Sequence, residues 1–187
     1  MKITFITSNR VKFAIADSIL KYKGISLVRN QMNLEEIQSE NVLDIARNSA
    51  KIAFSKIKKS VAVTDAGFYI TALNGFPGPF VKYANRYFDA DKLIQLMSDE
   101  PNRELIVREA LVVIDDFGAE HCYQTEFYGS VATNVYCSDT ASTFEKIFIP
   151  KNCDRPIAAF SKDEQFNYWK EGSTWNFVEC ADYQQKR

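Results

Sequence analysis

The sequence has little of what a zinc-stabilised or disulfide-bonded small protein needs. Its 187 residues include one histidine, His121, and four cysteines that never form a C-x-x-C pair. A structural zinc site needs four ligands at recognisable spacing, and this set lacks that spacing. No export signal is visible either, so we expect free thiols rather than disulfides at Cys122, Cys137, Cys153 and Cys180.

An excess of charge and a long apolar run are also missing. There are 23 basic and 24 acidic side chains, for a net charge of -1. This balance offers no electrostatic footprint for duplex DNA or an anionic membrane, although a small polyanion can still bind in a local pocket. The apolar run at residues 3–6 soon meets polar residues, so it resembles neither a signal peptide nor a membrane span. We therefore expect a cytoplasmic protein with no nucleic acid and no membrane as partner.

The rest of the composition is that of a folded protein, with 46% hydrophobic and 25% charged residues. No repeat, linker or low-complexity segment interrupts the chain, so we expect a single domain over residues 1–187. Apolar periodicity and turn residues predict an α/β order of elements. The expected strands are 2–6, 25–28, 61–63, 68–70, 108–115, 121–131 and 147–149, and the expected helices begin near residues 11, 42, 90 and 162.

A polar turn between the first strand and the first helix is the first candidate site. Thr7, Ser8 and Asn9 offer hydroxyl and backbone N–H groups at a helix N-terminus, and Lys12 adds a full charge on the first turn. Such an arrangement suits an anion, because the helix dipole and the free N–H groups both favour negative charge. Taken alone, this pattern is more typical of a capped helix with a solvated lysine.

Two further motifs carry carboxylates. Glu36 belongs to the segment Glu35–Gln38, which precedes the long helix that carries Lys51, and Asp65 ends a buried strand within the segment Thr64–Gly67. A carboxylate beside a glycine that allows close approach is a natural magnesium ligand. Each of these residues taken singly is more often a solvated surface charge.

The order of these motifs is more specific than any one of them. The chain has Thr-Ser-Asn-x-x-Lys, then Glu-Ile-Gln, then Asp-Ala-Gly-Phe, and then Ala-Leu-Asn-Gly-Phe-Pro-Gly at residues 72–78. Together they resemble the inosine/xanthosine triphosphate pyrophosphatase family over nearly the whole chain. The resemblance implies a two-lobed α/β fold, with a long, twisted mixed sheet flanked by helices and a central cleft. It also implies a homodimer that hydrolyses non-standard purine nucleoside triphosphates to monophosphate and pyrophosphate with Mg²⁺.

Positions carried over from the resemblance give each residue an expected role. Thr7, Ser8, Asn9 and Lys12 would hold the triphosphate, and Glu36 and Asp65 would hold the metal. Asp65 would also activate water, and Lys51 would assist catalysis as a phosphate contact. The family's helix lysine can instead be aligned with Ser49. Phe144 and Glu145 would contact the base.

The sequence departs from the family's pattern at both ends of the expected site. Thr64 stands where the family has a second acidic residue, and Ala66 stands where it has a hydroxyl. The family's base-reading Lys-Asn and Ser-His-Arg elements fall near Gln165-Phe166 and Trp169–Glu171, which do not match. We therefore expect altered base preference. The alternative is a catalytically weak nucleotide-binding or interaction protein on the same fold.

Overall fold

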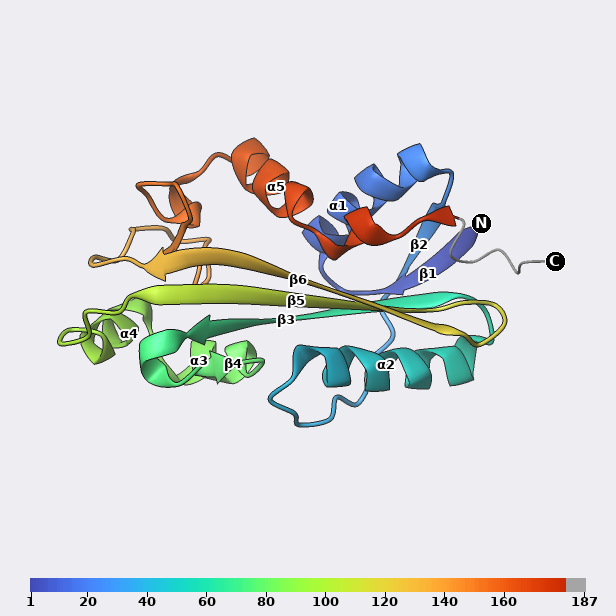
Figure 1. Cartoon of the computed structure of the whole chain (residues 1–187), viewed down its shortest axis with the longest axis horizontal. Coiled ribbons are helices and arrows are strands. Elements are labelled where there is room, and N and C mark those ends of the chain that lie inside the picture. Colours follow the sequence, from blue (N-terminus) through green and yellow to red (C-terminus); the bar gives the residue numbers. More distant parts are fainter. Residues whose placement is uncertain (181–187) are drawn as a thin grey trace. The chain divides into compact units, whose positions relative to one another are not determined.

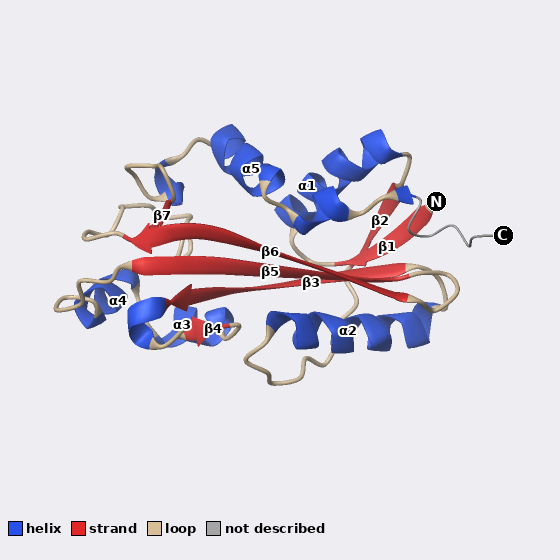
Figure 2. Ribbon diagram, viewed as in Figure 1, coloured by secondary structure: helices blue, strands red, loops and turns tan. Residues whose placement is uncertain are grey.

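The computed structural model of the protein describes residues 1–180, with the elements drawn in Figures 1 and 2. The strands are β1 (Lys2–Ile6), β2 (Ser26–Asn30), β3 (Val61–Ile70), β4 (Pro77–Gly78), β5 (Glu104–Ile114), β6 (Glu120–Val131) and β7 (Phe148–Pro150). The α-helices are α1 (Arg10–Leu20), α2 (Val42–Ile57), α3 (Val81–Tyr87), α4 (Ala90–Leu96) and α5 (Lys162–Glu171). The described residues also form the 3-10 helices η1 (Lys21–Lys23), η2 (Thr71–Leu73), η3 (Ile157–Ala159) and η4 (Thr174–Phe177).

The seven strands form one mixed sheet in the order β2-β1-β3-β5-β6-β7, and β4 pairs with β3. β1 is parallel to β2 and to β3, whereas β4 and β7 are antiparallel to their partners. The predicted α/β class with a mixed sheet is confirmed. The described chain divides into two compact units: unit 1 contains residues 1–65, 109–125 and 169–180, and unit 2 contains residues 66–108 and 126–168.

In unit 1, helices cover both faces of the strands (Figure 1). α2 lies on one face, and the apolar core beneath it consists of Ile6, Val42, Ala46, Ala50, Ala53, Val61, Val63, Ala110, Val112 and Ile114. α1 and η4 pack together on the other face, where the Trp175 ring meets Phe5 edge-on at 4.9 Å between centroids. Asn41 caps α2 by accepting from Leu43 N, so the helix begins at Val42, near the expected position.

In unit 2, aromatic side chains form much of the packing. The Phe68 ring lies 4.9 Å from Phe144 and 6.2 Å from Phe148, measured between centroids. On α5, Tyr168 packs against both Phe127 and Phe148, and burial raises the pKa of its hydroxyl. These aromatics fix the strand ends of unit 2 against α5.

Two features differ from the sequence prediction. β3 continues without a break through Thr64–Gly67, where a turn was expected. Gly67 occurs there because Gly78 O of β4 would lie 2.6 Å from a Cβ atom at this position, so the glycine permits close strand pairing rather than a turn. The short helix α3 was not predicted at all, since seven residues carry too little periodicity to be recognised.

Candidate functional site

The turn between β1 and α1 is held by its own side chains. Asn9 Oδ1 accepts from Val11 N at 2.9 Å and from Lys12 N at 3.1 Å, so Asn9 is the N-cap of α1. Thr7 Oγ1 accepts from Asn9 N at 3.1 Å. The sequence prediction of a strand, a polar turn and a helix is confirmed here. The Asn9 amide oxygen is engaged in capping, so this residue shapes the turn while Ser8 stays exposed beside it.

Asp65 lies within β3 as the last residue of unit 1's first segment. It is half-buried, and its Oδ2 atom is shielded from solvent. Thr64 precedes it and points to the opposite face, because successive side chains alternate along a strand. Of positions 64 and 65, only Asp65 carries a carboxylate. Its side chain lies on the face of β3 that also carries Val61 and Val63 beneath α2.

Glu36 lies in the irregular segment between β2 and α2, where it is exposed. It belongs to unit 1, as does Asp65. Within residues 1–180, no group of three or more His, Cys, Asp or Glu side chains is arranged to hold a metal ion. A closed protein cage of ligands is therefore not formed by the described residues.

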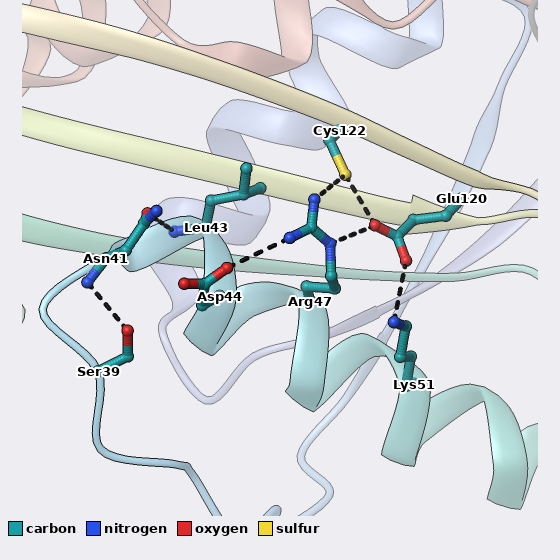
Figure 3. A network of polar contacts seen from close by, with 8 residues as sticks. All are labelled: Ser39, Asn41, Leu43, Asp44, Arg47, Lys51, Glu120 and Cys122. Carbon is teal, nitrogen blue, oxygen red and sulfur yellow. Dashed lines mark hydrogen bonds and ion pairs between the residues drawn. The ribbon is translucent and has the colours of Figure 1, made fainter.

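Lys51 belongs to a polar network that links α2 to β6, shown in Figure 3. Its ammonium nitrogen lies 3.6 Å from Glu120 Oε2 of β6, and its side chain is 61% exposed. Glu120 also accepts hydrogen bonds from Arg47 Nε and from the Cys122 thiol. Burial opposes ionisation of Glu120, but the hydrogen bonds from Arg47 and Cys122 outweigh it, so the pKa of this carboxyl lies below its usual value.

The same network argues against a reactive thiol. Burial raises the pKa of Cys122, and the neighbouring Glu120 carboxylate raises it further by disfavouring a second negative charge. Cys122 is a donor to Glu120 here, and its protonated form is the stable one. The network therefore fixes α2 to β6 through charge and hydrogen bonds.

The ion pair directs the Lys51 side chain toward β6. β6, which holds Glu120, is three strands away from β1 in the sheet, or roughly 14 Å at the usual strand spacing. Ser49, the alternative position for the family's helix lysine, is 3% exposed and carries no charge. In this structure Lys51 pairs with Glu120, and its role as a phosphate contact stays a prediction.

Phe144 and Glu145 are occupied by contacts within unit 2. Phe144 is fully buried, and the ring of Phe68 packs against it. Glu145 Oε2 accepts from Ser142 N at 2.7 Å, and Ser142 Oγ accepts from Glu145 N at 3.4 Å. This corrects the expectation that Phe144 offers a stacking face to a base. Large aromatic rings are usually buried, and the Phe144 ring has no exposed face in this structure.

Sequence reasoning missed Glu109 of β5. Its Oε1 atom accepts from the Thr174 hydroxyl at 2.6 Å, from Thr174 N at 3.1 Å and from Ser173 Oγ at 3.4 Å. Ser173, Thr174 and Trp175 are all buried, so Glu109 attaches the segment after α5 to the sheet of unit 1. No local pattern could have revealed this, because the partners are 64 and 65 residues apart in sequence.

Among the helices of residues 1–180, none combines the length and apolar character that crossing a membrane requires. A family model described as the Ham1 family matches residues 3–171. The chain is 28% identical over 165 residues to a dITP/XTP pyrophosphatase of Methanopyrus kandleri, which covers 88% of this chain and 87% of that protein. A dITP/XTP pyrophosphatase of Methanosarcina mazei is 38% identical over 102 residues, and this match spans about half of each protein, 54% of this chain and 55% of the relative.

Solved structures give the same fold. A nucleoside-triphosphatase, or dITP/XTP pyrophosphatase, of Mycobacterium abscessus matches with a TM-score of 0.75 at 22% identity, covering 92% of this chain and 94% of that one. A HAM1 protein of Coxiella burnetii matches with a TM-score of 0.77 at 16% identity, covering 91% and 97%. At these identities the likeness establishes the fold alone.

Proposed function

The chain belongs to the Ham1 family, and from this premise we propose that it hydrolyses nucleoside triphosphates to nucleoside monophosphate and pyrophosphate. One observation carries the proposal: Thr7, Lys12, Glu36 and Asp65, the expected phosphate and metal residues, all belong to unit 1. The relatives named dITP/XTP pyrophosphatases make inosine and xanthosine nucleotides the first substrates to test. In the proposed reaction, water attacks the α-phosphorus, the bond to the bridging oxygen breaks, and pyrophosphate leaves.

The turn before α1 is proposed to bind the triphosphate. The N-terminus of α1 carries the positive end of the helix dipole, and Lys12 on the first turn is a cation that is half-buried and therefore less screened by water. The capping bonds of Asn9 keep this turn in one conformation before substrate arrives. A preorganised anion site of this kind stabilises the charge that develops on the phosphoryl oxygens.

Asp65 is proposed to accept the proton of the attacking water or to orient that water. A carboxylate whose Oδ2 is shielded from solvent interacts more strongly with a nearby positive charge than an exposed one does. The hydroxyl of Thr64 does not ionise at pH 7, so it cannot act as the second carboxylate of this strand. Asp65 therefore carries the acid–base chemistry of this strand alone.

Mg²⁺ is the proposed cofactor, with Glu36 and Asp65 as its protein ligands. Magnesium usually keeps several waters and uses one or two carboxylates together with substrate phosphates, so a pair of carboxylates is a suitable donor set without a third protein ligand. When bound, the ion would neutralise phosphate charge and polarise the phosphorus–oxygen bonds. The homodimer and the cytoplasmic location implied by the resemblance remain predictions.

Base preference is proposed to be weaker than in typical relatives. Phe144 is buried and Glu145 is engaged with Ser142, so neither of the expected base contacts is freely available. Donors fitted to a purine 6-oxo group give strong discrimination because a wrong base leaves them unpaired. Without such donors, recognition depends on the phosphates, which all triphosphates share.

Pyrophosphate release from ITP, XTP, dITP, GTP and ATP tests the proposal, with the Methanopyrus kandleri protein measured in parallel. We expect release with Mg²⁺, none with EDTA, and a smaller ratio of kcat/KM between ITP and ATP than in the relative. The second candidate is a nucleotide-binding protein with little turnover, favoured by the loss of a carboxylate at Thr64. Tight nucleotide binding by calorimetry without pyrophosphate release would select that candidate.

A further inference from the structure

Arg29 of β2 holds a buried guanidinium nitrogen that lacks a hydrogen-bond acceptor. Its Nη1 atom is shielded from solvent and makes no hydrogen bond with any part of the chain that the structure describes. The guanidinium group keeps its charge at any physiological pH and always offers N–H donors. A buried donor without an acceptor is costly, so such groups in folded proteins nearly always meet a partner.

The strand register places Arg29 beside the turn that begins α1. Arg29 lies opposite Phe5 in the parallel pairing of β1 and β2, so the two side chains share a face of the sheet. That is the face on which Phe5 packs against Trp175 and on which α1 lies (Figure 1). The next residue, Asn30, accepts a hydrogen bond from Thr7 N at 2.9 Å through its backbone carbonyl. Arg29 is therefore one residue from the end of β2, next to the chain leading into α1.

The proposed phosphate site in unit 1 requires a further positive charge besides Lys12. A triphosphate needs more than one positive group, yet Lys51 pairs with Glu120 three strands away from β1. Lys12 is the cation that the sequence indicated at the turn. Arg29 adds a second cation from the neighbouring strand β2, on the face covered by the same helix.

We propose that Arg29 binds the polyphosphate chain of the substrate, with Nη1 donating to a phosphate oxygen. This inference rests on the proposed function and assigns to Arg29 the second positive group of its phosphate site. Guanidinium-to-phosphate hydrogen bonds are charge-assisted and frequently bidentate, and a lysine does not reproduce this geometry. The ligand class is a nucleoside triphosphate or an inorganic polyphosphate, since the contact involves phosphate alone.

Binding of inorganic triphosphate by calorimetry tests the inference without turnover. We compare the wild type with Arg29→Met, with Arg29→Lys, and with Lys59→Met, which removes an exposed positive charge after α2. We expect Arg29→Met to weaken binding about 10-fold to 100-fold, Arg29→Lys to weaken it less, and Lys59→Met to leave it nearly unchanged. The Tm of the ligand-free protein should not fall in Arg29→Met, because no protein hydrogen bond at Nη1 is lost.

Three results overturn the inference: wild-type affinity in Arg29→Met, an equal loss in Lys59→Met, or no binding of inorganic triphosphate by the wild type. If Arg29→Met folds poorly, Arg29→Lys replaces it in the test because it keeps the charge. Its affinity for inorganic triphosphate and its Tm are then compared with those of the wild type. A lower Tm with wild-type affinity in Arg29→Lys shows a structural role and also rejects the proposal. Failure of the proposed function has a different signature, because triphosphate binding can depend on Arg29 while no nucleotide releases pyrophosphate.

Discussion

Glu120 Oε2 of β6 lies 3.6 Å from the ammonium nitrogen of Lys51 on α2. This pairing connects α2 to β6, and it gives Lys51 a partner other than substrate. We therefore predict that Lys12→Ala raises KM for a nucleoside triphosphate by about tenfold or more, whereas Lys51→Ala changes it by less than about threefold. Steady-state kinetics of both variants with one nucleotide provide the measurement. A larger loss in Lys51→Ala would show that Lys51 leaves Glu120 and binds phosphate.

The carboxylate of Asp65 is predicted to be essential for turnover. Asp65→Asn retains the shape of the side chain but removes the charge that a metal or a catalytic water requires, so kcat should fall roughly 100-fold or more. Initial rates of pyrophosphate release measure this effect, with Lys162→Ala as the control because Lys162 is exposed on α5. If Asp65→Asn retains full activity, the catalytic carboxylate lies elsewhere.

Phe144 is predicted to act through stability rather than base recognition. The side chain is fully buried, and truncating such a phenylalanine usually costs about 3–5 kcal/mol of unfolding free energy. Urea unfolding of Phe144→Ala should show this loss. Phe144→Leu should retain most of the stability and the same ratio of kcat/KM between ITP and ATP. A changed ratio of kcat/KM between ITP and ATP in Phe144→Leu would show that Phe144 contributes to base recognition.

The turn between β5 and β6 is predicted to contribute acid sensitivity. Asp115 is 5% exposed; burial opposes its ionisation, but His121 and the N–H groups of Ala119 and Phe117 hold its pKa below the usual 3.8. A lowered folded-state pKa stabilises the protein above the unfolded-state value, and this stability is lost as the pH falls below about 4. In Asp115→Asn, the amide oxygen can still accept the two backbone bonds but cannot titrate. The difference in unfolding free energy between pH 7 and pH 3 should therefore be smaller in this variant than in the wild type, and an unchanged difference would contradict the assignment.

The features that the sequence predicted correctly depend on neighbouring residues. The turn at Thr7–Asn9 was recognisable because strand alternation, small polar residues and helical periodicity follow one another within about twenty residues. The start of α2 near residue 42 was recognisable in the same local way. The mixed α/β sheet follows from this succession of elements.

The features that the sequence missed depend on partners far along the chain. The pairing of Lys51 with Glu120 was not predicted, because the two residues are 69 positions apart and no local pattern links them. Phe144 was expected at the base because a single aromatic residue does not reveal whether Phe68 packs over it. The sequence predicted no role for Arg29, because an arginine in a strand is common. Only the structure shows that its Nη1 atom is buried.

Hydrolysis of ITP in ¹⁸O-labelled water tests the central claim most directly. With Mg²⁺, the account predicts equal amounts of IMP and pyrophosphate, with the label in the phosphate of IMP, since water attacks the α-phosphorus. The reaction of Asp65→Asn, purified in the same way, provides the control for contaminating phosphatases. Formation of IDP and inorganic phosphate, label in the pyrophosphate, or no hydrolysis of any nucleoside triphosphate would contradict the claim.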